Sequence, residues 1–165
     1  METPRARLPD APDLDLLDAA RRLSLKSDAL ISPVAGGGLA NEEPGYRRTF
    51  WVIDVDFLEV FQVKAVLRHV SLHAYWYMGD GVTVSDHDLR STAAAFEQRI
   101  YPTVTSAFGG LWSADVSGDQ RITILSARIP GVAGYYTAAD EYPTEVRRFS
   151  NQRKMVYMST VAFPV

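Results

Sequence analysis

One helical pattern with strand-like segments on both sides of it limits the folds open to this chain. The pattern begins at Ser85, which with Asp88 resembles a capping box. Apolar residues then recur at helical spacing as far as Phe108, and Gly109-Gly110 is a typical helix end. Pro102 interrupts the pattern and predicts either a kink or the start of a second short helix.

Four segments around this helix are dense in Val, Phe, Tyr and Trp, which favour strands. They cover residues 49–55, 61–78, 121–129 and 154–159. The sequence DFLE between the first two predicts a hairpin connection, and GDG after the second is a strong turn signal. Strands, a helix and more strands predict an α+β fold, with a twisted mixed or antiparallel sheet and one main helix.

The N-terminal segment differs in composition from the rest of the chain. Residues 1–11 are rich in Pro, Arg and Asp, which predicts disorder, and residues 13–25 carry leucines at near-helical spacing, which predicts a short helix. Residues 32–45 collect Gly, Pro and Asn and form the clearest linker. We therefore expect a boundary at this linker, between an N-terminal segment over residues 1–45 and a folded domain over residues 46–165. The start of the chain lacks the hydrophobic segment of a secretory signal.

The composition excludes several classes of function. Of the 165 residues, 47% are hydrophobic and 22% are charged, a balance that allows a buried core. The net charge is −3 with the two signs interspersed, so we expect no nucleic-acid partner. No apolar run approaches the roughly 20 residues of a membrane span. The absence of cysteine excludes disulfides, thiolate metal sites and cysteine nucleophiles.

Two histidines have the spacing of a helical zinc motif. His69 and His73 occur in HVSLH, but the position of the catalytic glutamate in H-E-x-x-H is occupied by Val70. The surrounding residues favour a strand, in which residues four apart share a face by simple alternation. A structural role is therefore the better interpretation. A small metal enzyme that uses both histidines with Asp86 or Asp88 is a much weaker alternative.

Two acidic segments are candidate sites. DVSGDQ, with Asp115 and Asp119, could hold Ca²⁺ but lacks the spacing and the terminal glutamate of a twelve-residue calcium loop, so a tight turn is favoured. AADEYP carries Asp140 and Glu141 side by side. Neighbours in a strand point apart, so we expect a loop-surface or hydrogen-bonding role rather than an acid/base pair.

The glycine- and tyrosine-rich segment PGVAGYY, residues 130–136, allows two interpretations. It could be a sheet edge on which a peptide lies, since glycines permit close approach of two backbones. It could equally be a bulged loop with Tyr135 and Tyr136 packed on the core, and the residue types by themselves favour this second interpretation.

Several segments in collinear order carry a resemblance to a known family. From about residue 13 to the end, and above all in TFWVIDV, FQVKAVLRHVSLHAYWYMGDGV, AFEQRIYPTVTSAFG, SGDQRITILSARIPGVAGYYTAADEYP and SNQRKMVYMS, the chain resembles bacterial secreted zinc metallopeptidases of the hyicolysin type. These enzymes belong to the thermolysin-like (gluzincin) group. The resemblance implies an extracellular protein in which residues 1–45 are a leader or propeptide-like segment. It also implies that residues 46–165 correspond to the upper, N-terminal subdomain of such an enzyme, incomplete at its C-terminal end.

In this family a segment similar to SNQRKMVYMS forms a sheet strand, and the next element is the helix with H-E-x-x-H. The resemblance implies that the sheet forms the roof of the substrate cleft and that an edge strand near Gly134, Tyr135 and Tyr136 pairs with an extended peptide or protein substrate. No H-E-x-x-H occurs in the chain. We therefore expect the N-terminal portion of a metallopeptidase, inactive alone, with zinc bound only by the intact parent protein.

A second hypothesis is a freestanding, non-catalytic module that binds a peptide or a protein through its sheet edge. The first hypothesis predicts exposed apolar surface where the metal-binding helix would pack, and the second predicts a cooperatively folded domain without such a surface.

Overall fold

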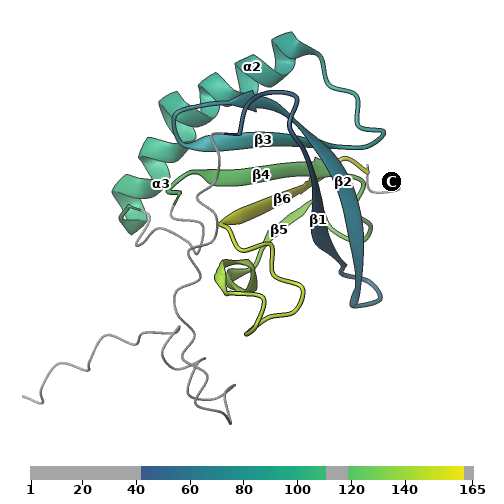
Figure 1. Ribbon diagram of the computed structural model, residues 1–165. Helices are drawn as coiled ribbons and strands as arrows, with labels where there is room; N and C mark the ends of the chain where they lie inside the picture. The colour runs from purple at the N-terminus through teal and green to yellow at the C-terminus, as the bar shows by residue number, and fades with distance from the viewer. Residues whose placement is uncertain (1–41, 111–118, 162–165) are drawn as a thin grey trace, which may run out of the picture. The chain divides into compact units, whose positions relative to one another are not determined.

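The computed structural model describes residues 42–110 and 119–161. Within them, a six-stranded mixed sheet has the strand order β1-β2-β3-β4-β6-β5 (Figure 1). The strands are β1 (Arg47–Asp54), β2 (Glu59–Val70), β3 (Ala74–Gly79), β4 (Ile122–Ala127), β5 (Gly134–Tyr136) and β6 (Met155–Ser159). The helices α2 (Asp86–Ala95) and α3 (Tyr101–Phe108) lie between β3 and β4 in the chain. The predicted α+β fold is confirmed, whereas the helix predicted at residues 13–25 lies outside the described residues.

The sheet combines an antiparallel half with a parallel centre. The strands β1, β2 and β3 form consecutive antiparallel pairs. β3 and β4 are parallel because the helical segment carries the chain back across the sheet. β4 and β6 are also parallel, and β5 pairs antiparallel with β6 at the far edge.

The strand predicted over residues 61–78 is two strands. β2 ends at Val70 and β3 begins at Ala74, and the Ser71 N–H donates to the carbonyl of Ala74 across the turn between them. The turn contains neither glycine nor proline, the two residues that most clearly mark a turn in a sequence. The prediction of one long strand was therefore wrong, although its strand character was right.

The predicted helix is present with its predicted start. The Ser85 hydroxyl oxygen accepts a hydrogen bond from the Asp88 N–H at 3.1 Å, as the capping-box pattern indicates. A second short helix, α3, begins at Tyr101 with Pro102 in its first turn, as one of the two alternatives predicted. A π-helical turn, Phe96–Ile100, joins α2 to it. Proline cannot donate a backbone hydrogen bond and crowds the preceding turn, so a widened turn before it accommodates both effects.

Each face of the sheet has its own core. On the helix face, the side chains of Leu89 and Ala93 from α2 pack on the sheet. The sheet residues that they cover are Ala74, Trp76, Met78 and Ile124, from β3 and β4. The inner face holds a larger cluster to which every strand contributes. Alternation along β3 sends Tyr75 and Tyr77 to this inner cluster and Ala74, Trp76 and Met78 to the helix face.

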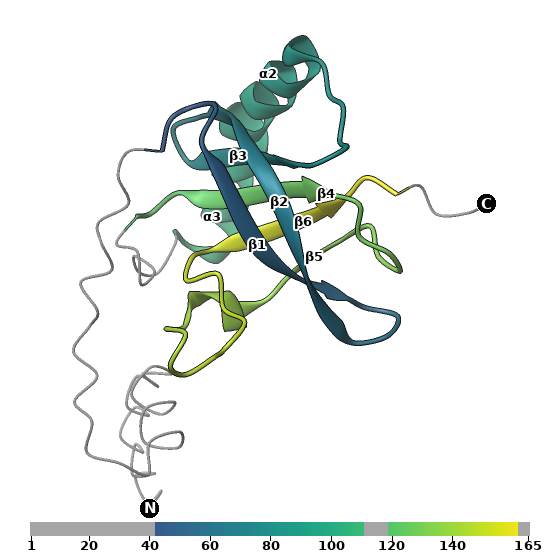
Figure 2. The same cartoon turned by 45° about the vertical axis from the view of Figure 1, so that its right-hand side comes forward.

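Side chains from the other end of the sheet bridge to the outer edge of β1. Figure 2 shows the β1–β2 hairpin crossing in front of β4 and β6, so the sheet is strongly curled. The Asn151 amide accepts from the Trp51 N–H at 2.9 Å and donates to the Trp51 carbonyl at 2.9 Å, as a neighbouring strand would. The Tyr135 hydroxyl accepts from the Ile53 N–H at 2.9 Å. These contacts satisfy main-chain groups that would otherwise be open on an edge strand.

A buried charge cluster ties the first described residue to the inner face. Glu42 is 6% exposed and its carboxylate accepts from Arg153, which is 1% exposed, at 3.0 and 3.1 Å. Arg48 and the Tyr77 hydroxyl also donate to Glu42, at 2.8 and 2.7 Å. Burial raises the pKa of Glu42, but these donors and positive charges outweigh it and hold the pKa below its usual value. The folded part of the chain thus includes Glu42, four residues before the boundary expected at residue 46.

Candidate functional site

The segment singled out in the sequence forms the outermost strand of the sheet. Gly134–Tyr136 is β5, and among the described residues it pairs with β6 alone. The Ser159 N–H donates to the Ala133 carbonyl at 2.8 Å, so by alternation the main-chain groups of Tyr135 point toward β6. Those of Gly134 and Tyr136 point to the other side, toward the outer edge. This edge is able to hydrogen-bond an added strand.

The two tyrosines of β5 point to opposite faces of the sheet. Tyr135 lies on the inner face, where its ring stacks on Tyr157 with 4.2 Å between ring centroids. Tyr136 lies on the helix face, is 57% exposed, and its hydroxyl donates to the Glu141 carboxylate. Both interpretations of this segment are therefore partly right: it is an edge strand, and only one of its two tyrosines packs on the core.

Glycine is required at the start of β5 by the close approach of β6. A Cβ atom placed on Gly134 would lie 2.7 Å from the Tyr157 carbonyl oxygen, a backbone atom that has little freedom to move. Any side chain here would therefore push β5 away from β6. The glycine thus permits the close pairing of β5 with β6.

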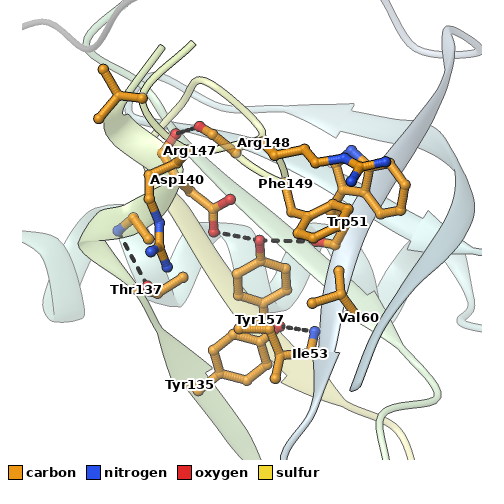
Figure 3. Close-up of a pocket in the computed structure, with 13 residues that line it drawn as sticks. Trp51, Ile53, Val60, Tyr135, Thr137, Asp140, Arg147, Arg148, Phe149 and Tyr157 are labelled. Atoms are coloured by element: carbon orange, nitrogen blue, oxygen red, sulfur yellow. Dashed lines mark hydrogen bonds between the residues drawn. The ribbon is translucent and has the colours of Figure 1, made fainter. Parts of the chain in front are cut away.

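A cavity of about 260 Å³ lies beside β5, where the sheet curls toward the edge of β1. Figure 3 shows Tyr157, Tyr135 and Ile53 at its base, with Trp51 of β1 and Val60 of β2 on one side. The other side is formed by the segment between β5 and β6. The lining residues of that segment are Thr137, Ala139, Asp140, Val146, Arg147, Arg148, Phe149 and Ser150.

Asp140 is the buried acid of this cavity wall. Its carboxylate accepts from the Asn151 N–H at 2.9 Å, from the Asn151 side-chain amide at 3.1 Å and from the Tyr157 hydroxyl at 2.6 Å. Burial raises the pKa of Asp140, although these hydrogen bonds oppose the shift. Burial, and the charge of Asp140 beside it, also raise the pKa of Tyr157. With its oxygens engaged, Asp140 serves to hold the segment before β6 in place.

Asp140 and Glu141 do not form a pair. Asp140 contacts Asn151 and Tyr157, whereas Glu141 accepts from Tyr136 on the exposed side of β5. The predicted hydrogen-bonding role is thus confirmed for Asp140. Asn151 and Trp51 were not predicted as site residues, and their contact spans 100 positions of the chain. The polar turn before the last strand was a visible signal for Asn151, but nothing in the sequence indicated its partner.

The two histidines belong to different local environments. His73 binds Glu97, with 2.6 Å between Nδ1 and Oε2, and stacks on Tyr101 at 3.8 Å between ring centroids. His69 lies in β2, in the irregular pairing that follows Leu67. In the described part of the chain, no group of three or more His, Cys, Asp or Glu side chains is placed to hold a metal ion.

The acidic residues proposed as partners of these histidines have other contacts. Asp86 pairs with Arg68, and Asp88 binds the Ser85 hydroxyl at the start of α2. Of the two acids considered for calcium, Asp115 lies outside the described residues. Asp119 accepts from the Tyr75 hydroxyl at 2.7 Å and from the Arg121 N–H at 2.8 Å. The hydrogen bond from the Arg121 N–H to the Asp119 carboxylate, two residues earlier, fits the predicted tight turn.

The helix covers only one half of the sheet. Its core contacts are with β3 and β4, and Val156 of β6 is only partly buried against them. Farther along this face, the exposed fraction is 46% for Met158 and 57% for Tyr136. Exposed apolar side chains also occur along the second part of the helical segment, at Ile100, Val104 and Phe108. An apolar surface of this kind is what a further packing element would cover.

No family model matches this chain, and no curated protein matches it. Among the described residues, no helix is long and apolar enough to cross a membrane.

Proposed function

We propose that this chain supplies the cleft-roof sheet of a secreted zinc metallopeptidase of the hyicolysin type. The zinc ligands and the general base come from residues beyond this chain, and the chain alone does not hydrolyse peptides. The parent protein acts outside the cell and cleaves peptide bonds by zinc-assisted hydrolysis.

One observation carries the proposal: the helix face of the sheet is covered over β3 and β4 and exposed over β6 and β5. Tyr136 and Met158 lie on the exposed part. Met158 belongs to β6, the strand after which the family places its metal-binding helix, and Tyr136 belongs to the neighbouring β5. A helix packed there would lie directly beside β5. The zinc that it carries would then face the same edge to which a substrate strand can bind.

The geometry of β5 suits the substrate role. A peptide paired with its outer edge would be held by the main-chain groups of Gly134 and Tyr136, independently of the peptide's sequence. Such pairing fixes the direction of the substrate backbone and leaves its side chains free to select pockets. Main-chain recognition of this kind is appropriate for an endopeptidase that accepts many sequences.

The first test is the DNA sequence that follows the codon for Val165. We expect an open frame that encodes H-E-x-x-H on a predicted helix within about 30 codons. Replacing the glutamate of that motif by glutamine in the longer product should abolish casein hydrolysis while zinc stays bound. A frame that continues without any such motif contradicts the proposal.

The second test addresses β5 in that longer product. Tyr136→Pro removes the N–H that points to the outer edge, and Tyr136→Val removes the same side chain but keeps the N–H. We expect KM for an extended peptide to rise about 2- to 10-fold in the proline variant relative to the valine variant, the effect of one lost hydrogen bond. Equal kinetics in the two variants would remove β5 from the substrate site.

A non-catalytic peptide- or protein-binding module is the second candidate, and the same open edge of β5 favours it. The metallopeptidase proposal requires a further helix over the exposed half of the sheet, whereas such a module requires none. The isolated chain would then bind no apolar dye and would unfold in one cooperative transition.

A further inference from the structure

We propose that the cavity between β1 and the segment before β6 is a binding site for a small carboxylate with an apolar or aromatic body. The site is separate from the outer edge of β5. The inference does not depend on the proposed peptidase function.

The cavity is the right size for a single side chain or a small acid. Its volume of about 260 Å³ lies just below the range of roughly 300–1,000 Å³ typical of drug-sized ligands. Aromatic and aliphatic side chains form the base and the β1 side of it (Figure 3). An aromatic ring placed there would contact Trp51, Tyr135 and Phe149.

Two arginines supply positive charge at this apolar site. Figure 3 shows the Arg147 side chain running down the wall toward Thr137, opposite Trp51. Arg148 lies over the Phe149 ring, with 5.2 Å from its guanidinium carbon to the ring centroid. Within residues 42–110 and 119–161, neither arginine forms an ion pair with a carboxylate. A guanidinium can bind a carboxylate through two parallel hydrogen bonds, so Arg147 is the natural anchor for the acid group.

Asp140 sets the charge that the site accepts. It lies on the same wall as Arg147, whose positive charge favours its ionised form. Its oxygens are already occupied by Asn151 and Tyr157, so it does not offer a binding group to a cationic ligand. Its negative charge beside the cavity opposes a doubly charged anion such as phosphate. A singly charged carboxylate can pair with Arg147 and meets only about half of that repulsion.

A carboxylate attached to an apolar or aromatic group occurs both in free small acids and in the C-terminal residue of a peptide. The experiment therefore uses 3-phenylpropionate, the neutral 3-phenylpropanol, and the peptide Gly-Gly-Phe with either a free or an amidated C-terminus. Binding to the full chain is measured by calorimetry and by the fluorescence of Trp51, with a Trp51→Phe variant to assign the signal.

We expect saturable binding of 3-phenylpropionate at millimolar concentration, and binding of the alcohol about 10- to 100-fold weaker. The free-acid peptide binds if a peptide terminus is accepted, and its amide then binds in the same weak range as the alcohol. Binding of 3-phenylpropionate without the peptide assigns the site to free acids. No saturable binding of either acid overturns the proposal, as does equal binding of the acid and the alcohol.

Two variants and one control locate the site. Arg147→Gln should weaken the binding of 3-phenylpropionate about 10- to 100-fold, because it removes the charge-assisted hydrogen bonds. Ala139→Leu should weaken it by filling the cavity while Arg147 remains. Arg128→Gln removes an exposed arginine that does not line the cavity and should leave binding unchanged. An affinity that is the same in wild type and Arg147→Gln, with both proteins folded by circular dichroism, contradicts the assignment.

Discussion

The two halves of the sheet differ in how completely they are covered. Around β3 and β4, the helix closes one face, and on the other Tyr77 and Thr123 contact the buried charges of Glu42 and Arg153. Around β6 and β5, Tyr136 and Met158 are exposed on one face, and a cavity opens on the other. The half that contains β3 and β4 is thus covered on both faces. The other half has exposed apolar side chains, a cavity and an edge strand that pairs on one side among the described residues.

Substitutions on the helix face should separate the two halves most strongly. Trp76→Ala removes a buried ring that packs edge-on against Phe96, and we expect the free energy of unfolding to fall by about 3–5 kcal/mol. Met158→Ala on the uncovered half should change it by less than about 0.5 kcal/mol. Urea unfolding of both variants checks this. Similar losses of unfolding free energy at the two positions would mean that Met158 is packed. The two halves of the sheet would then not differ in how they are covered.

The inner face gives the next largest effect. Glu42→Ala leaves the Arg153 guanidinium buried without its carboxylate, and we expect a loss of about 3 kcal/mol or more in the free energy of unfolding. The matched control is Asp86→Ala, which breaks an exposed ion pair with Arg68 and should cost about 0–1 kcal/mol. Equal losses of unfolding free energy in the two variants would show that the buried cluster stabilises the fold no more than an exposed ion pair does.

The smallest expected effect is a difference in pH dependence between the two buried acids. The pKa of Glu42 is held down in the folded state, so its stabilisation is present above its unfolded value and is lost as the pH falls below about 4.5. The pKa of Asp140 is raised, so its ionisation destabilises the folded state as the pH rises above about 3.8. On acidification, stability should therefore fall less in Glu42→Gln than in wild type, and more in Asp140→Asn.

Denaturant titrations between neutral pH and the acid range measure this contrast. Matching pH profiles in both variants and in wild type would show that neither carboxylate is shifted as described. A profile that changes in the same direction for both would contradict the difference between the closed half and the open half.

The local parts of the fold could be predicted from the sequence. Ser85 and Asp88 mark the start of the helix because a capping box depends only on residues close together in the chain. β5 was harder, since GYY fits both an edge strand and a packed loop. The break at residues 71–73 was missed because no residue there demands a turn.

The site depends on contacts that no local pattern contains. Asn151 acts as a strand partner for Trp51, and Tyr135 reaches Ile53, only because the sheet curls until its two ends approach. The cavity arises from the same curl. The pairing of Glu42 with Arg153 likewise joins the two ends of the folded region, so it could not be read from either segment alone.

The central claim is that this sheet is one part of a catalytic unit completed elsewhere. The most direct measurement compares casein hydrolysis by the purified chain, freed of contaminating proteases, with hydrolysis by the longer product that adds the predicted zinc helix. We expect zinc-dependent cleavage from the longer product and none from the chain alone. Cleavage by the chain alone that is lost with a chelator and restored by zinc would contradict the account.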